Sequence, residues 1–140
     1  MTADQGALAV GLRATVSAEV TQADTAQALG SGDLQVLGTP RLLALAEAAS
    51  VAAIAPQLAD GQSTVGTSVS LEHRRPTTLG AQIEVEAELT EIEGRRLVFM
   101  FIAYGPGTGD DAVIGAGTVE RVMIDRDRFL ARARGAGQAG

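Results

Sequence analysis

Three side chains of this sequence, Thr39, Glu47 and His73, are of types that move protons or attack carbonyl groups in enzymes. Glu47 is the only charged residue in the eighteen that follow Arg41, which are otherwise small or apolar apart from Ser, Pro and Gln. If this carboxylate faces the interior, desolvation disfavours the anion and raises its pKa, as in carboxylates tuned for acid–base or nucleophilic work. The alternative, which the pattern supports equally, is that Glu47 lies on a narrow exposed stripe with Arg41 and Gln57.

His73 is the only histidine of the chain and ends a stretch, residues 64–73, in which apolar and polar residues alternate. The alternation predicts a strand with one face made of Val65, Val69, Leu71 and His73 and another made of Ser68, Ser70 and Glu72. An imidazole on the apolar face could act as a general base or orient a carbonyl group. The alternative is a histidine with a purely structural role.

The Thr39-Pro40 pair predicts the start of a helix, with Thr39 as the N-cap and Pro40 at the first helical position. Capping alone is sufficient to explain this pair. A hydroxyl at a helix N-terminus also lies beside free backbone N–H groups and the positive end of the helix dipole, where an oxyanion can be stabilised.

Four arginines in turns are candidates for binding the phosphates of an anionic substrate: Arg74, Arg75, Arg95 and Arg96. The alternative for these residues, favoured for Arg95 and Arg96, is ordinary solvated turn charge. The glycine-rich segment 105–109 has neither a lysine nor a following helix, so it does not fit a phosphate-binding loop and is interpreted as a connection between strands.

Composition excludes several classes of protein. The eleven basic residues are all arginines, and seventeen acidic residues give a net charge of −6, unlike the basic surface of a nucleic-acid-binding protein. With no cysteine and one histidine, thiolate zinc sites and histidine-rich metal sites are excluded, and we expect neither a metal nor a cofactor. The sequence shows neither a signal peptide nor an apolar stretch long enough to span a membrane, so we expect a cytoplasmic protein.

The 140 residues predict a single domain with its core at about 11–132 and a loose Gly/Ala tail after Arg134. Periodicity predicts one helix among five strands, in the order β-α-β-β-β-β. The first strand covers 11–20, and a loop with at most a short helical turn at 23–29 leads to a helix from 39 to about 55. The later strands cover 64–73, 83–89, a central 96–104 and 112–124, and a short helix at 125–132 is allowed.

This order predicts an α+β domain. Because the helix is apolar nearly all round, we expect the antiparallel five-stranded sheet to wrap around it, which is the hot-dog fold. Another open α+β sandwich with a helix on one face would account for the same periodicities.

The chain resembles the hot-dog-fold acyl-CoA thioesterases, in particular the fluoroacetyl-CoA thioesterase-like branch, over almost all of 11–132. Two residue pairs carry the likeness: Thr39 with Glu47 eight residues later, and Gly66 with His73 seven later. Two longer stretches also match: Val85-Glu86-Ala87-Glu88-Leu89 followed by Glu93-Gly94-Arg95-Arg96-Leu97, and Gly117-Thr118-Val119-Glu120-Arg121.

The resemblance implies a dimer, with a tetramer also possible, in which two sheets join edge to edge and the CoA arm runs along the subunit interface. It implies that Thr39, Glu47 and His73 form the catalytic site there. The backbone of Gly66 would support this site, and Arg121 also matches a position of the family. Whether Glu47 would act as nucleophile or as base for water stays open.

The chain departs from this branch where specificity is set, because the segment 33–38 has no aromatic lid residue and Val119 replaces a histidine. We therefore expect hydrolysis of a small or medium acyl-CoA rather than of fluoroacetyl-CoA. A pocket lined by Leu34, Val36, Leu42 and Val69 would give a modest preference among acyl chains. One alternative is a protein that binds an acyl-CoA or another small ligand without catalysis. Another is a hydratase or dehydratase of the same fold, which is disfavoured because the Asp/His pair usual in those enzymes is absent around His73.

Overall fold

The computed structural model describes residues 7–139 as one sheet with one long helix packed on it. The elements are β1 (Arg13–Glu19), α1 (Ala26–Leu29), α2 (Thr39–Ile54), β2 (Gln62–His73), β3 (Gln82–Glu93), β4 (Arg96–Tyr104), β5 (Val113–Asp125) and α3 (Arg126–Ala139), with 3-10 helices at Gln22–Asp24, Ala55–Gln57 and Gly109–Ala112. The antiparallel strands are ordered β1-β3-β4-β5-β2. The predicted element order and the central position of β4 are confirmed.

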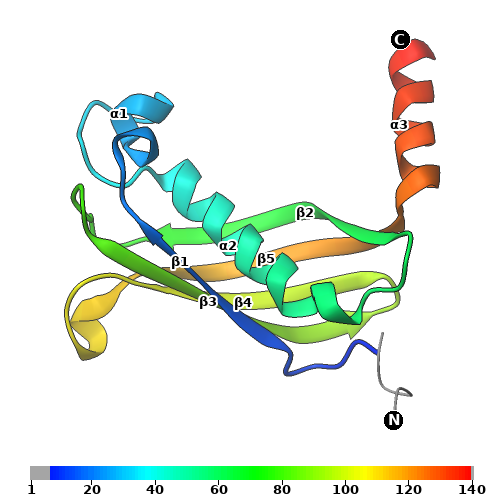
Figure 1. Ribbon diagram of the computed structural model, residues 1–140, viewed down its shortest axis with the longest axis horizontal. Helices are drawn as coiled ribbons and strands as arrows, with labels where there is room; N and C mark the ends of the chain where they lie inside the picture. Colours follow the sequence, from blue (N-terminus) through cyan, green and yellow to red (C-terminus); the bar gives the residue numbers. More distant parts are fainter. Residues whose placement is uncertain (1–6, 140) are drawn as a thin grey trace.

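Figure 1 shows α2 lying across one face of the sheet. Residues 22–29, which contain a 3-10 helix and α1 and are called the α1 segment here, rise at one end of β2, and α3 rises at the other. The face of α2 toward the sheet buries apolar residues at helical spacing, among them Leu42, Leu45, Ala49 and Ile54. They pack on the alternating inward residues of β3 and β4, which include Val85, Leu89, Phe99 and Phe101. This layer is the core of the domain.

The five-stranded sheet curls around one side of α2, as predicted, and leaves the other side of the helix exposed in the single chain. Ala44, Ala48 and Ala52 form an exposed stripe, and Val51 beside them is 41% exposed. A sheet covers only the side of a helix that faces it, and small alanine side chains leave little apolar area in water. The sequence of the helix is therefore apolar on every side, although only the side toward the sheet is buried.

The predicted alternation in β2 is interrupted by a β-bulge at Thr67, where the pairing with β5 shifts between Gly66 and Ser68. Beyond the bulge, Val69 pairs with the buried Val119, as expected for the inward face. Before it, Val65 pairs with Val122, which neighbours Arg96 on the outer face of the sheet, so the prediction that Val65 shares a face with Val69 is wrong. The extra residue has the consequence that Gly66 and His73, seven positions apart, both face α2.

The prediction that Thr39 is the N-cap of α2 is wrong, because Thr39 is the first residue of the helix. Gly38 is the cap, in extended conformation, and its carbonyl accepts hydrogen bonds from the backbone N–H groups of Arg41 and Leu42. Pro40 lies in the first turn as expected. Because the backbone of Gly38 begins the helix, the hydroxyl of Thr39 is left for another partner.

The C-terminal segment is helical for longer than the sequence indicates. α3 continues to Ala139, past Arg134, where we expect a loose tail. Alanine and arginine are strong helix formers, and a glycine costs only about 1 kcal/mol relative to alanine. Among residues 7–139, no helix has both the length and the apolar character needed to cross a bilayer.

The packing of α2 on the sheet predicts a large loss of stability when its buried side is truncated. Leu42 is fully buried, so Leu42→Ala should lower the free energy of unfolding by about 2–5 kcal/mol. Leu34, which is 64% exposed, provides the control: Leu34→Ala should change it by less than about 0.5 kcal/mol. Urea denaturation followed by circular dichroism measures both, and equal effects of the two variants would contradict this description of the core.

Candidate active site

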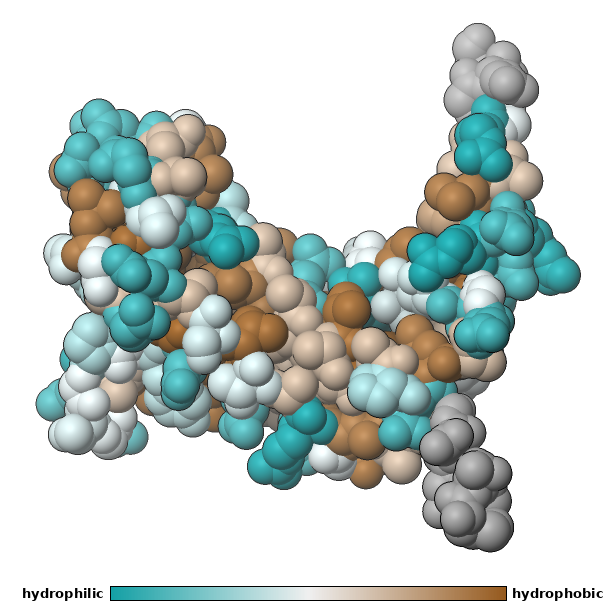
Figure 2. Space-filling model, viewed as in Figure 1, coloured by the Kyte–Doolittle hydropathy of each residue, from teal (hydrophilic) through white to brown (hydrophobic). Residues whose placement is uncertain are grey.

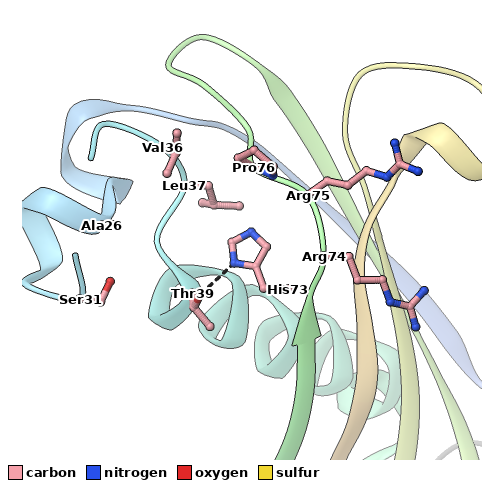
Figure 3. Close-up of a pocket in the computed structure, with 9 residues that line it drawn as sticks. All are labelled: Ala26, Ser31, Val36, Leu37, Thr39, His73, Arg74, Arg75 and Pro76. Atoms are coloured by element: carbon pink, nitrogen blue, oxygen red, sulfur yellow. Dashed lines mark hydrogen bonds between the residues drawn. The ribbon is translucent and has the colours of Figure 1, made fainter. Parts of the chain in front are cut away.

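Thr39 and His73 meet at the N-terminus of α2. The Thr39 Oγ1 and the His73 Nδ1 are 2.8 Å apart, a hydrogen bond in which either atom can donate, depending on the tautomer of the ring. Both side chains line a cavity of about 270 Å³ (Figure 3). Its other lining residues are Ala26, Ser31, Val36, Leu37, Arg74, Arg75 and Pro76. The cavity combines an apolar wall with two hydroxyls, an imidazole and two guanidinium groups.

His73 is half-buried, and this burial lowers the pKa of its imidazole, an effect that the nearby backbone of Arg75 opposes only in part. The ring is therefore neutral at pH 7. Its Nε2 is buried and has no hydrogen-bond partner among the described residues. A neutral imidazole with one nitrogen held by a hydroxyl is in the protonation state that a general base requires.

The wall of this cavity is fixed to α2 through the segment before it. The Arg41 Nε donates to the Asp24 Oδ1 at 2.9 Å, and the Gly38 N–H donates to the Asp24 carbonyl. Although burial opposes it, hydrogen bonds from Thr21 together with Arg41 keep the pKa of Asp24 below its ordinary value. A Cβ on Gly38 would come within 3.1 Å of the Ala26 backbone, so glycine permits this close approach. The first turn of α2 and the α1 segment thus form one unit.

Glu47 lies two turns further along α2, where it contacts Arg121 of β5. The Arg121 Nη1 donates to the Glu47 Oε2 at 3.1 Å, and the same guanidinium donates from Nε to the Thr64 hydroxyl and from Nη2 to the Thr64 carbonyl. Arg121 is 7% exposed, and burial lowers the pKa of its guanidinium although Glu47 opposes this. A Cβ on Gly66 would collide with the Glu47 Oε2, so any other residue here would force the Glu47 carboxylate to move.

The sequence leaves two environments open for Glu47, a buried carboxylate and a residue on an exposed stripe, and the structure shows neither of them. The Glu47 side chain is 33% exposed, and a guanidinium neutralises its charge, so it is neither an isolated buried carboxylate nor part of a solvated stripe. Its anion is oriented by Arg121 toward β2 and β5. Such a fixed and partly accessible carboxylate can accept a proton or attack an electrophile.

The predicted site residues thus form two clusters in one chain. Thr39 and His73 are in contact, and Glu47 joins Gly66 and Arg121. Eight residues of helix separate Thr39 from Glu47, which places their Cα atoms about 12 Å apart. Of the predicted pocket residues, Val36 lines the cavity, whereas Leu34 is 64% exposed and outside it, Leu42 is buried in the core, and Val69 packs against the core.

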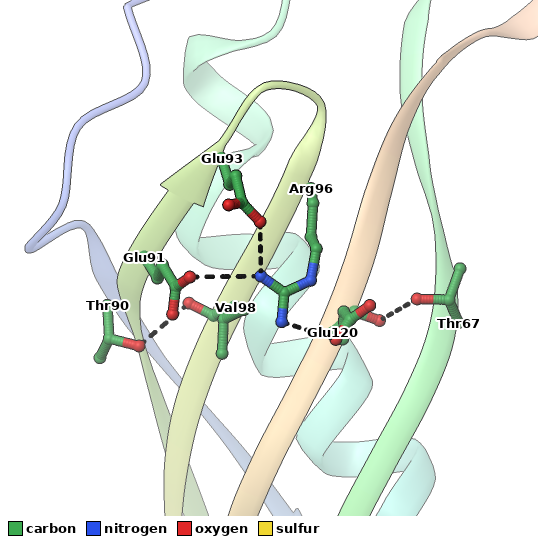
Figure 4. A network of polar contacts seen from close by, with 7 residues as sticks. All are labelled: Thr67, Thr90, Glu91, Glu93, Arg96, Val98 and Glu120. Atoms are coloured by element: carbon green, nitrogen blue, oxygen red, sulfur yellow. Dashed lines mark hydrogen bonds and ion pairs between the residues drawn. The ribbon is translucent and has the colours of Figure 1, made fainter.

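Three of the four turn arginines have carboxylate partners. Arg74 pairs with Glu72 at 2.9 Å, and Arg75 lies 3.5 Å from Asp111. Arg96 holds together a surface network with Glu91, Glu93 and Glu120 (Figure 4). Arg95 has no ion pair with any described residue. Arg74 and Arg75 line the cavity beside His73 despite these pairings.

Sequence reasoning missed Thr64 and the bulge at Thr67, which together orient Arg121 and Gly66. A glycine inside a strand is the one signal that indicates a bulge or a close approach at this point. No group of three or more His, Cys, Asp or Glu residues suited to a metal ion occurs within residues 7–139.

The chain is similar to known proteins in both sequence and fold. Residues 20–127 match the profile of the fluoroacetyl-CoA-specific thioesterase family. The fluoroacetyl-CoA thioesterase of Streptantibioticus cattleyicolor is 38% identical over 106 residues, which are 76% of this chain and 73% of the relative.

Two solved structures are similar to the chain over nearly its whole length. One is a threonine-to-serine mutant of a fluoroacetyl-CoA thioesterase in complex with acetyl-CoA, with a TM-score of 0.83, 32% identity and coverage of 92% of this chain and 98% of the other. The other is a hypothetical protein of Thermus thermophilus described as a thioesterase superfamily member, with a TM-score of 0.84, 26% identity and 94% coverage of both chains. These neighbours confirm the predicted hot-dog fold.

The contact between Glu47 and Arg121 predicts energetic coupling between them. Arg121→Gln should lower the free energy of unfolding by about 1–3 kcal/mol because it also leaves Thr64 without its donors. A double-mutant cycle with Glu47→Gln should give a coupling energy of about 0.5–3 kcal/mol. The exposed Arg13–Glu88 pair is the matched control and should give less than about 1 kcal/mol. Equal coupling in the two cycles would contradict the assignment of a fixed Glu47.

Proposed function

The chain belongs to the fluoroacetyl-CoA-specific thioesterase family, so its reaction is the hydrolysis of an acyl-CoA thioester, and we propose that Thr39, Glu47 and His73 carry it out. The observation that carries this assignment is the 2.8 Å contact of Thr39 with a neutral, half-buried His73 in the wall of a cavity. This pair occurs at the N-terminus of the helix that also bears Glu47.

In the proposed reaction, water supplies a hydroxyl group to the thioester carbonyl carbon, the C–S bond breaks, and the departing thiolate takes up a proton. His73 is neutral at pH 7, so it can take a proton at its unpartnered Nε2 or, in the other tautomer, donate from it. The Thr39 hydroxyl fixes the ring and, beside the first N–H groups of α2, polarises the carbonyl oxygen. No metal or cofactor takes part in this proposal.

Glu47 has two possible roles in this scheme. As a base it would remove a proton from the attacking water, and as a nucleophile it would form an acyl-glutamyl anhydride that water then hydrolyses. Both roles need the carboxylate held in place, and the Arg121 guanidinium donates to its Oε2 at 3.1 Å. Both also need Glu47 and the Thr39–His73 pair to reach one substrate, although they lie about 12 Å apart along α2 in one chain.

This separation supports a site completed at the interface of a homodimer, and the exposed edge of β2 is the suited surface. Beyond its pairing with β5, β2 has no strand partner in the described chain, and its twelve residues contain no lysine or proline and no charge before Glu72. The other edge, β1, has seven residues and carries a charge at each end, Arg13 and Glu19. We propose that two copies pair along β2, which adds a second chain beside Gly66 and His73.

The proposed substrates are small or medium acyl-CoA thioesters in the cytoplasm. Val36 and Leu37 provide the apolar wall of the cavity, and the segment 33–38 has no aromatic side chain. Each methylene in contact with such a wall changes selectivity by about 1–3 kcal/mol, which supports a graded preference rather than strict selection of one acyl group.

Thiol release from a panel of acyl-CoA thioesters, from acetyl to aromatic, tests the assignment. Glu47→Gln and His73→Ala should each lower kcat by about 100-fold or more because each removes a reacting group. Leu34→Ala, at an exposed position outside the cavity, is the control and should leave kcat unchanged within about twofold. Unchanged rates in both site variants would contradict the catalytic assignment, and binding of acyl-CoA without thiol release would favour a binding protein.

The lowered pKa of His73 predicts how activity depends on pH. The neutral imidazole is required, so kcat/KM should fall as the pH drops through the pKa of His73, and the midpoint should lie below the ordinary value of 6.5. The residual activity of His73→Gln should lack this acidic limb. A limb centred above 6.5, or one that persists in His73→Gln, would contradict a buried neutral histidine as the base.

A further inference from the structure

The arginines of this acidic chain fall into two groups. Six have carboxylate partners within 4.0 Å: Arg13, Arg41, Arg74, Arg75, Arg96 and Arg121. The remaining five have no ion pair within the described chain, and all lie in or beside α3: Arg95, Arg126, Arg128, Arg132 and Arg134. Together with Asp127, the four arginines of α3 give it a net charge of +3 in a chain whose total is −6. Unpaired positive charge is thus concentrated at one end of the molecule.

Arg95, Arg128 and Arg132 surround a small cavity of about 120 Å³ at the base of α3. Phe129 lies among them and is 36% exposed. The one carboxylate of the lining, Asp125, caps α3 by accepting from the Arg128 backbone N–H at 2.9 Å. Guanidinium groups beside an aromatic face suit an adenine nucleotide, whose ring stacks and whose phosphates pair with arginine.

This cluster is too far from the Thr39–His73 cavity of its own chain to hold the same acyl-CoA. α3 follows Asp125, which pairs with Gln62 at the start of β2, whereas His73 ends the strand. Eleven steps along a strand span about 36 Å. The pantetheine arm of CoA has about as many backbone bonds as four or five residues, so it spans about 15 Å when extended.

In the dimer proposed above, the same cluster lies close to the other active site. Antiparallel pairing of β2 with its copy over the full strand sets Gln62 opposite the partner's His73, about 5 Å away across the strands. Asp125 lies one strand further, about 10 Å from the partner's His73. Figure 1 shows α3 and the α1 segment rising past the β2 edge at its two ends, and Figure 2 shows the hollow between them. A two-fold axis through this hollow brings α3 beside the partner's α1 segment.

α3 exposes apolar side chains that a second copy of the chain could cover. It projects from the sheet, and its two large apolar side chains, Phe129 and Leu130, are 36% and 44% exposed. A fourteen-residue helix without packing is marginal in water. A neighbour at its base would stabilise it.

We propose that Arg95, Arg128 and Arg132 of one protomer, with Phe129, bind the phosphoadenosine end of the acyl-CoA whose thioester lies in the partner's active site. The inference rests on the proposed function and on the β2 dimer, and it adds a substrate-binding residue set supplied in trans. The rest of the chain, which is strongly acidic, would otherwise repel the phosphates of CoA. α3 thereby gives the enzyme its recognition of CoA as a thiol carrier.

Kinetics with two forms of one acyl group test the binding role. For the Arg128→Gln/Arg132→Gln variant, KM for acetyl-CoA should rise about tenfold or more with kcat unchanged, and KM for acetyl-pantetheine, which lacks the nucleotide, should not change. Arg13→Gln, an exposed arginine on β1, is the matched control and should leave both KM values unchanged. Unchanged KM for acetyl-CoA, or an equal rise for acetyl-pantetheine, would overturn the proposal.

Binding of CoA itself separates this inference from the proposed function. If the wild-type protein hydrolyses no thioester, the proposed function fails, but calorimetry with CoA still tests the cluster. CoA should bind the wild type about tenfold or more tightly than the Arg128→Gln/Arg132→Gln variant, and pantetheine should bind both equally. Equal affinity of the two proteins for CoA would overturn the nucleotide-binding role.

Mixed dimers test whether the arginines act in trans. A chain carrying His73→Ala is combined with a chain carrying Arg128→Gln/Arg132→Gln, so that only the second chain has an intact Thr39–His73 pair. The proposal predicts the wild-type KM for acetyl-CoA, because α3 of the first chain serves the partner's site. A KM equal to that of the arginine variant alone would show that α3 serves its own chain and would overturn the assignment.

Discussion

The arrangement of the site depends on one irregularity, the bulge at Thr67 in β2. In a regular strand, residues seven positions apart point to opposite faces, so Gly66 and His73 could not both face α2. The extra residue turns both inward, which lets Glu47 seat against Gly66 and Arg121 while Thr39 contacts His73. One inserted residue thus sets both ends of the candidate site.

The two titratable groups of the candidate site, Glu47 and His73, have different electrostatic environments. The carboxylate of Glu47 lies at a partly exposed position and faces a buried guanidinium, and that guanidinium is in turn held by Thr64. The imidazole of His73 is neutral because burial lowers its pKa, and its Nδ1 is hydrogen-bonded to the Thr39 hydroxyl. One chain therefore offers a carboxylate on α2 and a neutral imidazole on β2, beside the same helix. Their separation, and the open edge of β2 beside them, make the second chain part of the proposed chemistry.

The sequence predicts the fold well because both of its periodicities are clear. Ile83, Val85, Ala87 and Leu89 alternate in β3 and all are buried, and the apolar run in β4 marks the central strand. The predicted faces of β2 are right after the bulge and wrong before it. A glycine in the strand is the only sign of the bulge that the sequence offers. The prediction that Thr39 caps the helix also fails, because it rests on neighbouring residues alone. In the structure, the Thr39 hydroxyl contacts His73, and Gly38 is the cap. The environment of Glu47 could not be predicted, since its partner Arg121 lies 74 positions away.

The central claim is that two chains paired along β2 form the thioesterase. Sedimentation of the active enzyme, with thiol release recorded as the protein band moves through an acyl-CoA solution, tests it most directly. The account predicts that the hydrolysing species sediments with the mass of two chains and that the Glu47→Gln protein sediments as the same dimer without releasing thiol. A hydrolysing species with the mass of a single chain would contradict it.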